Sequence, residues 1–143
     1  MIVSHAWLRS FAPHDKAAHA IGELLNDHTV TLDGLESLRN DIAHIVVGLV
    51  VEQAPHPDSD HLSITKVDDG SGTLLDVVCG APNVTAGVKY PFARTGSTMP
   101  DGLKIEKRKI RGQTSNGMLC SSRELKLSGD HDGILPLTTN AAP

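Results

Sequence analysis

Four side chains that can bind metal ions lie within six residues of one another in the segment HPDSDH: His56, Asp58, Asp60 and His61. A transition-metal site needs its ligands held in a defined geometry, and nothing in this short segment supplies a rigid framework. A turn between two strands, in which aspartate side chains accept hydrogen bonds from nearby backbone N–H groups, accounts for the same residues. We therefore predict a turn at 56–61 and no metal site.

A second acidic segment and two cysteines are the other candidates for metal binding or catalysis. In GDHDG, residues 129–133, Asp130 and Asp132 lack the further oxygen ligands of a calcium loop. Cys79 and Cys120 form no CxxC pair and are too few for a zinc site, and their apolar neighbours predict buried free thiols in a reducing compartment. The sequence has no recognisable nucleophile arrangement and no glycine-rich phosphate loop. It therefore contains no catalytic constellation.

Positive charge is concentrated in one part of an acidic chain. The whole chain has a formal net charge of −4, whereas residues 104–126 contain seven basic and two acidic side chains, a net charge of +5. Five of these basic residues form what we call the basic strip: Lys104, Lys107, Arg108, Lys109 and Arg111. Small residues that would let a sugar–phosphate backbone approach closely follow it: Gly112, Ser115, Asn116 and Gly117. Such a track is typical of nucleic-acid-binding proteins, and a solvated strand face is the competing explanation.

Composition limits how the basic strip could act. Hydrophobic residues make up 39% of the chain and aromatic residues only 3%, so aliphatic side chains must fill the core. Few rings are available to stack on bases, which disfavours binding that depends mainly on stacking. The start, MIVSHAWLRSF, has too short an apolar run for a signal peptide, and no segment approaches the roughly 20 apolar residues of a membrane span. We therefore expect a soluble, cytoplasmic protein without a membrane partner.

Strand-like segments separated by turn signals would position these residues. From residue 42 onward, five runs rich in β-branched or alternating apolar residues are bounded by Gly, Pro or Asp-Gly: 42–54, 61–72, 73–81, 88–95 and 103–112. No long helix intervenes, so we predict a mainly β fold, a five-stranded barrel of the OB type. In the fifth run Leu103 and Ile105 have one parity and Ile110 has the other, which predicts a bulge or sharp coil near Lys107–Arg108.

Strand alternation also divides the basic strip. In a regular strand Lys107, Lys109 and Arg111 share one face, and Lys104 and Arg108 share the other. Arg111 leads directly into the small-residue loop, where RNA could approach. We therefore predict Lys107, Lys109 and Arg111 as the main phosphate contacts.

The first 40 residues follow a different pattern. Ser4 is placed to cap a short helix containing Trp7, Leu8 and Phe11, and Asp15 to cap a second helix over 16–27. TVTLDGLESL, residues 29–38, is predicted to be a strand with a turn at its Asp-Gly. Two short helices and a strand bury little by themselves. We therefore predict a small α/β segment at 1–40, in need of a packing partner, and a barrel domain at 41–143.

Four motifs, in order over about residues 42–135, closely resemble the tRNA-binding OB domain family. They are HPDSDHLSITKVDDG, VVCGAPNV, KIRGQTSNGMLCSSRELKL and GDHDGIL. The head MIVSHAWLRSF, followed by a helix and LDGLE, is similar to the start of bacterial phenylalanyl-tRNA synthetase β subunits. The resemblance implies that the chain is an N-terminal fragment of such a subunit. It also implies that the head packs with segments that follow the OB domain.

The resemblance further implies a parent enzyme that ligates phenylalanine to its tRNA with ATP and magnesium. In that family an (αβ)₂ heterotetramer acts, the α subunit holds the catalytic site, and this fragment would hold neither a catalytic residue nor a cofactor. Its partners would be phenylalanine-specific tRNA and the α subunit. Residues expected to contact tRNA from the family motifs are Asn83, Lys104, Arg111, Ser115 and Met118, which join Lys107 and Lys109 from the strip.

Two departures from the family pattern leave alternatives open. His61 and Thr85 stand where relatives often have basic residues, so two phosphate contacts are missing. Met118 is also explained by packing in the core. The chain could instead be a free-standing RNA-binding OB protein, or a docking module without RNA contact. The N-terminal head favours the synthetase fragment over the first alternative, and the basic strip favours it over the second.

Overall fold

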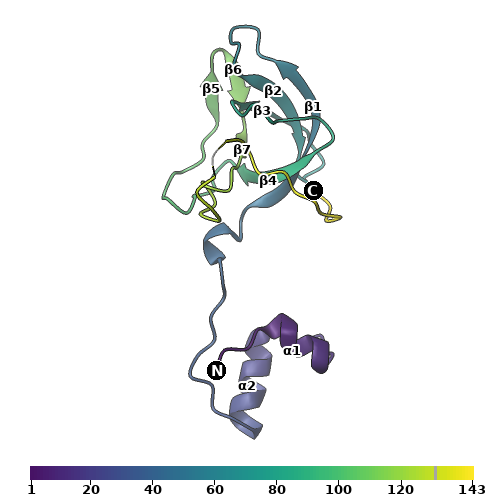
Figure 1. The fold of residues 1–143 in the computed structure, drawn as a ribbon, viewed down its shortest axis with the longest axis vertical. Coiled ribbons are helices and arrows are strands. Elements are labelled where there is room, and N and C mark those ends of the chain that lie inside the picture. The colour runs from purple at the N-terminus through teal and green to yellow at the C-terminus, as the bar shows by residue number, and fades with distance from the viewer. Residues whose placement is uncertain (131) are drawn as a thin grey trace. The chain divides into compact units, whose positions relative to one another are not determined.

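The computed structural model describes residues 1–130 and 132–143. They form two compact units, Met1–Leu38 and Arg39–Pro143, which we call unit 1 and unit 2 and describe separately (Figure 1). In the part of the chain that the structure describes, no helix combines the length and the apolar character needed to cross a bilayer.

Unit 1 contains two helices, α1 (His5–Phe11) and α2 (Ala18–His28). The predicted cap of α1 is confirmed, because Ser4 Oγ accepts a hydrogen bond from Trp7 N at 3.0 Å. The predicted Asp15 cap of α2 is wrong: the helix begins later, after Ala17, whose side chain provides no cap. The carbonyl of Lys16 lies 3.1 Å from Nε2 of His5 instead of starting the helix.

The strand predicted at 29–38 is not formed, and these residues are loop. A strand needs a partner for its backbone N–H and C=O groups, and the described residues of unit 1 include no other strand. The unit buries little: Gly22 is the only buried residue within its two helices, and Trp7 and Phe11 are 57% and 73% exposed.

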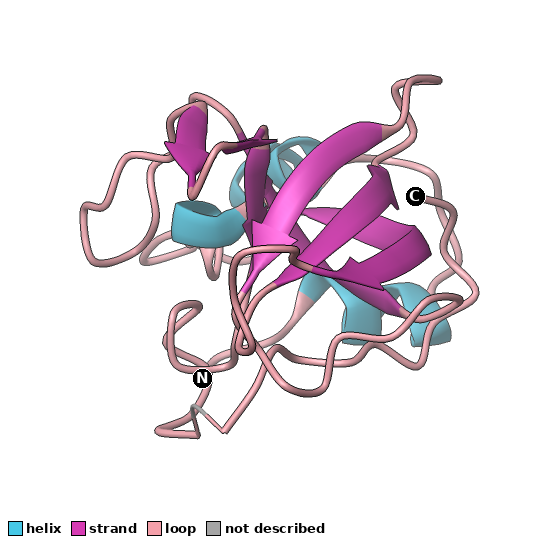
Figure 2. Ribbon diagram, turned by 90° about the horizontal axis from the view of Figure 1, so that it is seen from above, coloured by secondary structure: helices cyan, strands magenta, loops and turns pink. Residues whose placement is uncertain are grey.

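Unit 2 is built on a five-stranded antiparallel sheet in the order β3-β2-β1-β4-β7. Its strands are β1 (Val46–Pro55), β2 (Ser63–Asp68), β3 (Leu75–Cys79), β4 (Lys89–Arg94) and β7 (Gly117–Leu119). Figure 2 shows the strands, in magenta, twisted and curled round a common interior. The backbone N–H of Asn116, immediately before β7, donates to the carbonyl of Asp76 in β3 at 2.8 Å. The barrel is therefore nearly closed. The predicted mainly β, OB-like barrel is confirmed.

The identity of the fifth strand differs from the prediction. Residues 103–112 do not join the sheet; instead β5 (Arg108–Ile110) and β6 (Gln113–Ser115) form a separate hairpin. The barrel is completed by β7, whose Leu119 is buried, because an apolar segment can face the interior and a row of lysines and arginines cannot. Residues 105–107, just before β5, are loop, so the chain does leave regular strand geometry near Lys107.

The interior of unit 2 is aliphatic, with two buried rings. Val50, Val67, Val77, Tyr90 and Phe92 are at most 1% exposed and form the centre of the barrel core. Gly117 has φ +145°, and a Cβ there would lie 2.3 Å from Cζ of Phe92, so only glycine lets β7 approach this ring. A second buried cluster joins β4 to the loops that follow it: Ala93, Met99, Ile105, Cys120 and Leu125.

Candidate nucleic-acid interface

A groove of about 880 Å³ opens on unit 2, lined by β3, the β5–β6 hairpin, β7 and residues 121–126. Its apolar lining includes Val78, Ile105, Ile110, Met118 and Ile134. Its charged lining contains four basic and three acidic side chains: Lys104, Arg108, Arg123, Lys126, Asp101, Glu106 and Glu124. The groove therefore combines an apolar wall with charges of both signs, four positive and three negative.

The β5–β6 hairpin decides which basic side chains face the groove. Arg108 pairs with Ser115 and Lys109 with Thr114, and the two residues between the strands, Arg111 and Gly112, have φ +46° and +85°. Positive φ at both positions is the signature of a type I′ turn. Facing residues in a pair share one side of a hairpin, so Arg108 lies with Ser115 on the groove side and Lys109 on the opposite side.

The single row of Lys107, Lys109 and Arg111 is consequently not formed. Lys107 precedes the hairpin and Arg111 lies in its turn, so strand alternation does not relate them to Lys109. The groove is lined instead by Lys104 and Arg108, the pair of opposite parity, and the other three side chains lie outside its lining. Sequence reasoning missed the turn because Arg-Gly is a weaker signal for a type I′ turn than Asn-Gly or Asp-Gly.

The basic side chains of unit 2 divide into those bound to the protein and those that are free. Arg111 Nη1 donates to the carbonyl of Asp58 at 2.9 Å, and Lys126 Nζ donates to the carbonyl of Pro100 at 2.8 Å. Among the described residues, no acidic side chain forms an ion pair with any of the following: Lys104, Lys107, Arg108, Lys109 and Arg123. All five are exposed, so their charge is available to a ligand.

Ser115 lies in the groove wall, but its hydroxyl is engaged in closing the barrel. The side chain is 4% exposed, and its oxygen accepts from Val78 N and donates to the carbonyl of Gly117, both at 3.1 Å. These bonds join β3 to the connection between β6 and β7. Met118 is half-buried, packs against the second buried cluster and also lines the groove.

Asn83 explains why two distant motifs occur together. Its Nδ2 donates to the carbonyl of Ile134 at 2.7 Å, and its Oδ1 accepts from the amide of Ile134 at 2.9 Å. A Cβ at position 133 would lie 2.3 Å from Oδ1 of Asn83, so the side-chain amide of Asn83 fits only because residue 133 is glycine. CGAPNV and DGIL therefore form one structural contact, and Asn83 is not in the groove lining.

The metal-like segments are turns. His56 is 3% exposed, and its Nδ1 accepts from Asp58 N at 3.0 Å, so the turn at 56–61 is confirmed, although the ring of His56 and not a carboxylate caps Asp58. In the second segment Asp130 Oδ1 accepts from Asp132 N at 3.1 Å, and His131 lies outside the described residues. Across 1–130 and 132–143, no three His, Cys, Asp or Glu side chains are grouped so that they could hold a metal ion.

Both cysteines are free and buried, as predicted. Burial raises the pKa of the Cys120 thiol to about 12, and it also raises the pKa of Cys79. Thiols in this state are protonated near neutral pH and are poor nucleophiles.

A small, nearly closed barrel whose groove presents exposed, unpaired cations is an architecture that binds oligonucleotides. The family model described as "Putative tRNA binding domain" matches residues 45–143, and the chain belongs to this family.

The most similar relatives include proteins named phenylalanine–tRNA ligase β subunit. The chain is 49% identical over 137 residues to the one from Nitratidesulfovibrio vulgaris, covering 96% of this chain and 17% of the relative. It is 48% identical over 143 residues to that of Oleidesulfovibrio alaskensis, and 43% over 141 residues to that of Idiomarina loihiensis, covering 100% and 99% of this chain and 18% of each relative. The chain thus spans less than a fifth of their length.

Proposed function

We propose that this chain is the N-terminal, tRNA-binding part of a phenylalanine–tRNA ligase β subunit. Similarity to the three named β subunits extends over 96% to 100% of the chain, so it includes unit 1 as well as the barrel. A free-standing tRNA-binding OB protein would have no use for the head. This coverage supports the synthetase assignment over the free-standing alternative.

In this assignment the complete enzyme ligates phenylalanine to its tRNA in the cytoplasm, using ATP and magnesium. It acts as an (αβ)₂ tetramer whose α subunit holds the catalytic site. The present chain contributes tRNA binding, contains no catalytic group and binds neither ATP nor magnesium. Its first 40 residues pack with later parts of the β subunit, and residues 41–143 are the tRNA-binding domain.

The observation that carries tRNA binding is the set of free cations on the groove. Lys104, Arg108 and Arg123 line it, are exposed and have no acidic partner among the described side chains. Tyr90 and Phe92, the two aromatic residues of unit 2, are at most 1% exposed and cannot stack on bases. Binding therefore rests on phosphate contacts, which makes it tolerant of sequence and steeply dependent on salt.

The seven predicted residues take different roles in this proposal. Lys104 contacts phosphate together with Arg108, and Met118 supplies the apolar wall behind them. Lys107 and Lys109 lie outside the groove lining and contribute long-range attraction only. The remaining three position the loops that surround the groove: Asn83, Arg111 and Ser115.

Titration with tRNA at several salt concentrations tests this proposal. The double variant Lys104→Ala/Arg108→Ala should bind more weakly, and its log–log salt slope should flatten by about 0.7 to 0.9 unit for each phosphate that is no longer neutralised. The matched control is Lys107→Ala/Lys109→Ala, which removes the same charge from the same segment but outside the groove. The control should change the slope by less than half as much.

Three results would contradict the proposal in different ways. If the control pair flattened the slope and the groove pair did not, RNA would bind on the outer face of the hairpin. If the wild-type chain bound tRNA without any dependence on salt, binding would not rest on phosphate contacts. If it did not bind tRNA at all, the domain would be a docking module and the groove would have another use.

A further inference from the structure

One wall of the groove is an irregular turn, Ser121–Leu127, which we call the 121–127 turn. Four of its residues line the groove: Ser121, Arg123, Glu124 and Lys126. Glu124 Oε2 accepts from Ser121 N at 2.6 Å, and Ser121 Oγ accepts from Glu124 N at 3.3 Å, a reciprocal arrangement that fixes the beginning of the turn. The end of the turn is closed by backbone hydrogen bonds from Lys126 N to the carbonyl of Arg123 and from Leu127 N to the carbonyl of Ser122, both at 2.9 Å, and other parts of unit 2 also hold it.

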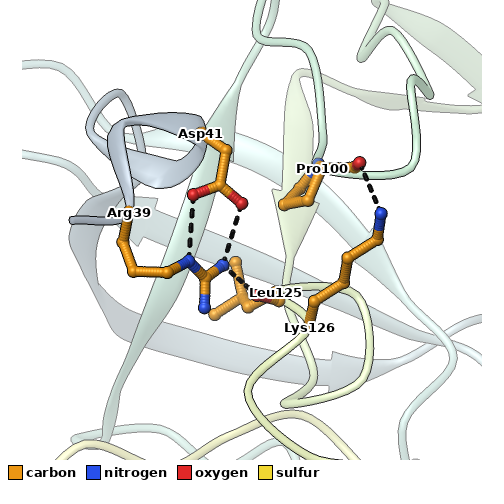
Figure 3. A network of polar contacts seen from close by, with 5 residues as sticks. All are labelled: Arg39, Asp41, Pro100, Leu125 and Lys126. Carbon is orange, nitrogen blue, oxygen red and sulfur yellow. Dashed lines mark hydrogen bonds and ion pairs between the residues drawn. The ribbon is translucent and has the colours of Figure 1, made fainter. Parts of the chain in front are cut away.

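Figure 3 shows the contacts that hold the end of the turn. Nε and Nη2 of Arg39 donate to the two carboxylate oxygens of Asp41 at 2.9 and 3.0 Å, and Nη2 also donates to the carbonyl of Leu125. Lys126 Nζ donates to the carbonyl of Pro100. The guanidinium of Arg39 is thus oriented by one carboxylate and bonded to the backbone of the turn, 86 residues away along the chain.

The backbone at both ends of this network is held in an unfavourable conformation. Arg39 and Lys126 have φ of +59° and +51°, in the left-handed region that residues with a Cβ seldom adopt. At Lys126 this conformation belongs to the backbone closure of the turn, and at Arg39 it comes immediately before the short 3-10 helix Asn40–Ile42. The hydrogen bond with Arg39, followed by the positive charge of the same guanidinium, lowers the pKa of Asp41, so the carboxylate is ionised at neutral pH.

We propose that Arg39 is a positioning residue for the groove: paired with Asp41, it holds the 121–127 turn so that Arg123 faces bound tRNA, and it does not itself contact the RNA. This inference rests on the proposed function. It assigns a role to a basic residue that lies outside the basic strip and outside the groove lining.

The variant Asp41→Ala distinguishes a positioning role of Arg39 from direct phosphate contact, because the two roles predict opposite changes in tRNA affinity. Asp41→Ala leaves the charge of Arg39 in place and removes an acidic group. If Arg39 bound phosphate directly, freeing it would tighten tRNA binding. If Arg39 positions the turn, removal of its orienting partner should weaken binding about threefold to tenfold, as expected for coupled neighbours.

A double-mutant cycle tests the route through Arg123. Arg39→Ala should weaken binding about as much as Arg123→Ala, and the double variant should be no weaker than Arg123→Ala alone. The matched control is Lys66→Ala, which breaks a comparably exposed ion pair with Asp76, N···O 2.7 Å, away from the groove lining. Lys66→Ala should leave the salt slope unchanged.

Hydrogen exchange supplies a reading that does not depend on RNA. The amides of Lys126 and Leu127, bonded to the carbonyls of Arg123 and Ser122 at 2.9 Å, should exchange faster in Arg39→Ala and Asp41→Ala and keep their rate in Lys66→Ala. Three outcomes would overturn the inference and leave tRNA binding intact. They are tighter binding by Asp41→Ala, additive effects of Arg39→Ala and Arg123→Ala in the cycle, and unchanged affinity in both the Arg39 and the Asp41 variant. A wild-type chain without salt-dependent tRNA binding would refute both.

Discussion

At the scale of single residues, several polar side chains of the family motifs are bound to the protein itself. Asn83 makes two hydrogen bonds with the backbone of Ile134, and Ser115 makes two that close the barrel. Removing one partner of a buried or half-buried hydrogen bond leaves the other unsatisfied. These hydrogen bonds give both side chains a structural role that requires no contact with RNA.

Asn83→Ala should therefore act on stability more than on binding. Removing both bonds should lower the free energy of unfolding by about 1 to 3 kcal/mol, measured by urea denaturation, while tRNA affinity per folded molecule stays within about twofold. Asn83→Asp is the matched isosteric variant: it still accepts from the Ile134 amide but sets a carboxylate oxygen against the Ile134 carbonyl in place of the donor, so it should also lose stability. A loss of affinity without a loss of stability would instead place Asn83 in contact with tRNA.

The buried thiols predict a second residue-scale effect. Burial raises the pKa of Cys120 from its ordinary value of 9.0 to about 12, so the unfolded chain ionises this thiol first as pH rises. Stability should be unaffected by this group below about pH 9 and should fall between about pH 9 and 12. Thermal melts should show a smaller alkaline loss in Cys120→Ala than in the wild type. An identical loss in both would show that Cys120 does not titrate in this range.

At the scale of elements, the β5–β6 hairpin depends on its turn. Gly112 has φ +85°, and apart from its two chain neighbours nothing lies within 4 Å of a Cβ built there, so the backbone conformation alone requires glycine. Gly112→Ala should lower stability by about 1 kcal/mol and speed exchange of the hairpin amides. Gly129→Ala is the control, because Gly129 is equally open and has no positive φ, and it should be close to neutral. Equal effects of the two changes would contradict the type I′ turn.

At the scale of the whole molecule, the two units differ in how much they bury. The helices of unit 1 bury only Gly22, and Trp7, Phe11 and Leu38 are exposed, whereas the core of unit 2 includes side chains that are fully buried. Local stability follows buried apolar contact. Amides of α1 and α2 should therefore exchange much faster than those of β1 and β2 when this chain is studied by mass spectrometry. Equal protection would mean that unit 1 already has all the packing partners it needs.

Local patterns in the sequence were sufficient for the cap of α1, the turn at 56–61, the first four strands and the OB-like barrel. The cap, the turn and the four strands depend on neighbours within a few residues, as alternation, capping and turn chemistry do, and several such strands without a long helix between them indicated the barrel. The helix cap at Asp15 and the strand at 29–38 were wrong because non-local groups decide them: a carbonyl lying against His5, and the lack of a strand to pair with.

The candidate site divides in the same way. Charge counting alone located the basic strip and the small residues beside it, since net charge is a property of the sequence. Only the tertiary structure decided which cations face the groove, because a tight turn at Arg111–Gly112 replaces strand alternation and backbone carbonyls of distant segments bind individual cations. The same is true of Arg39, which reaches the carbonyl of Leu125 across 86 residues of chain. Contacts that bridge such separations depend on how the barrel closes, and no local pattern encodes them.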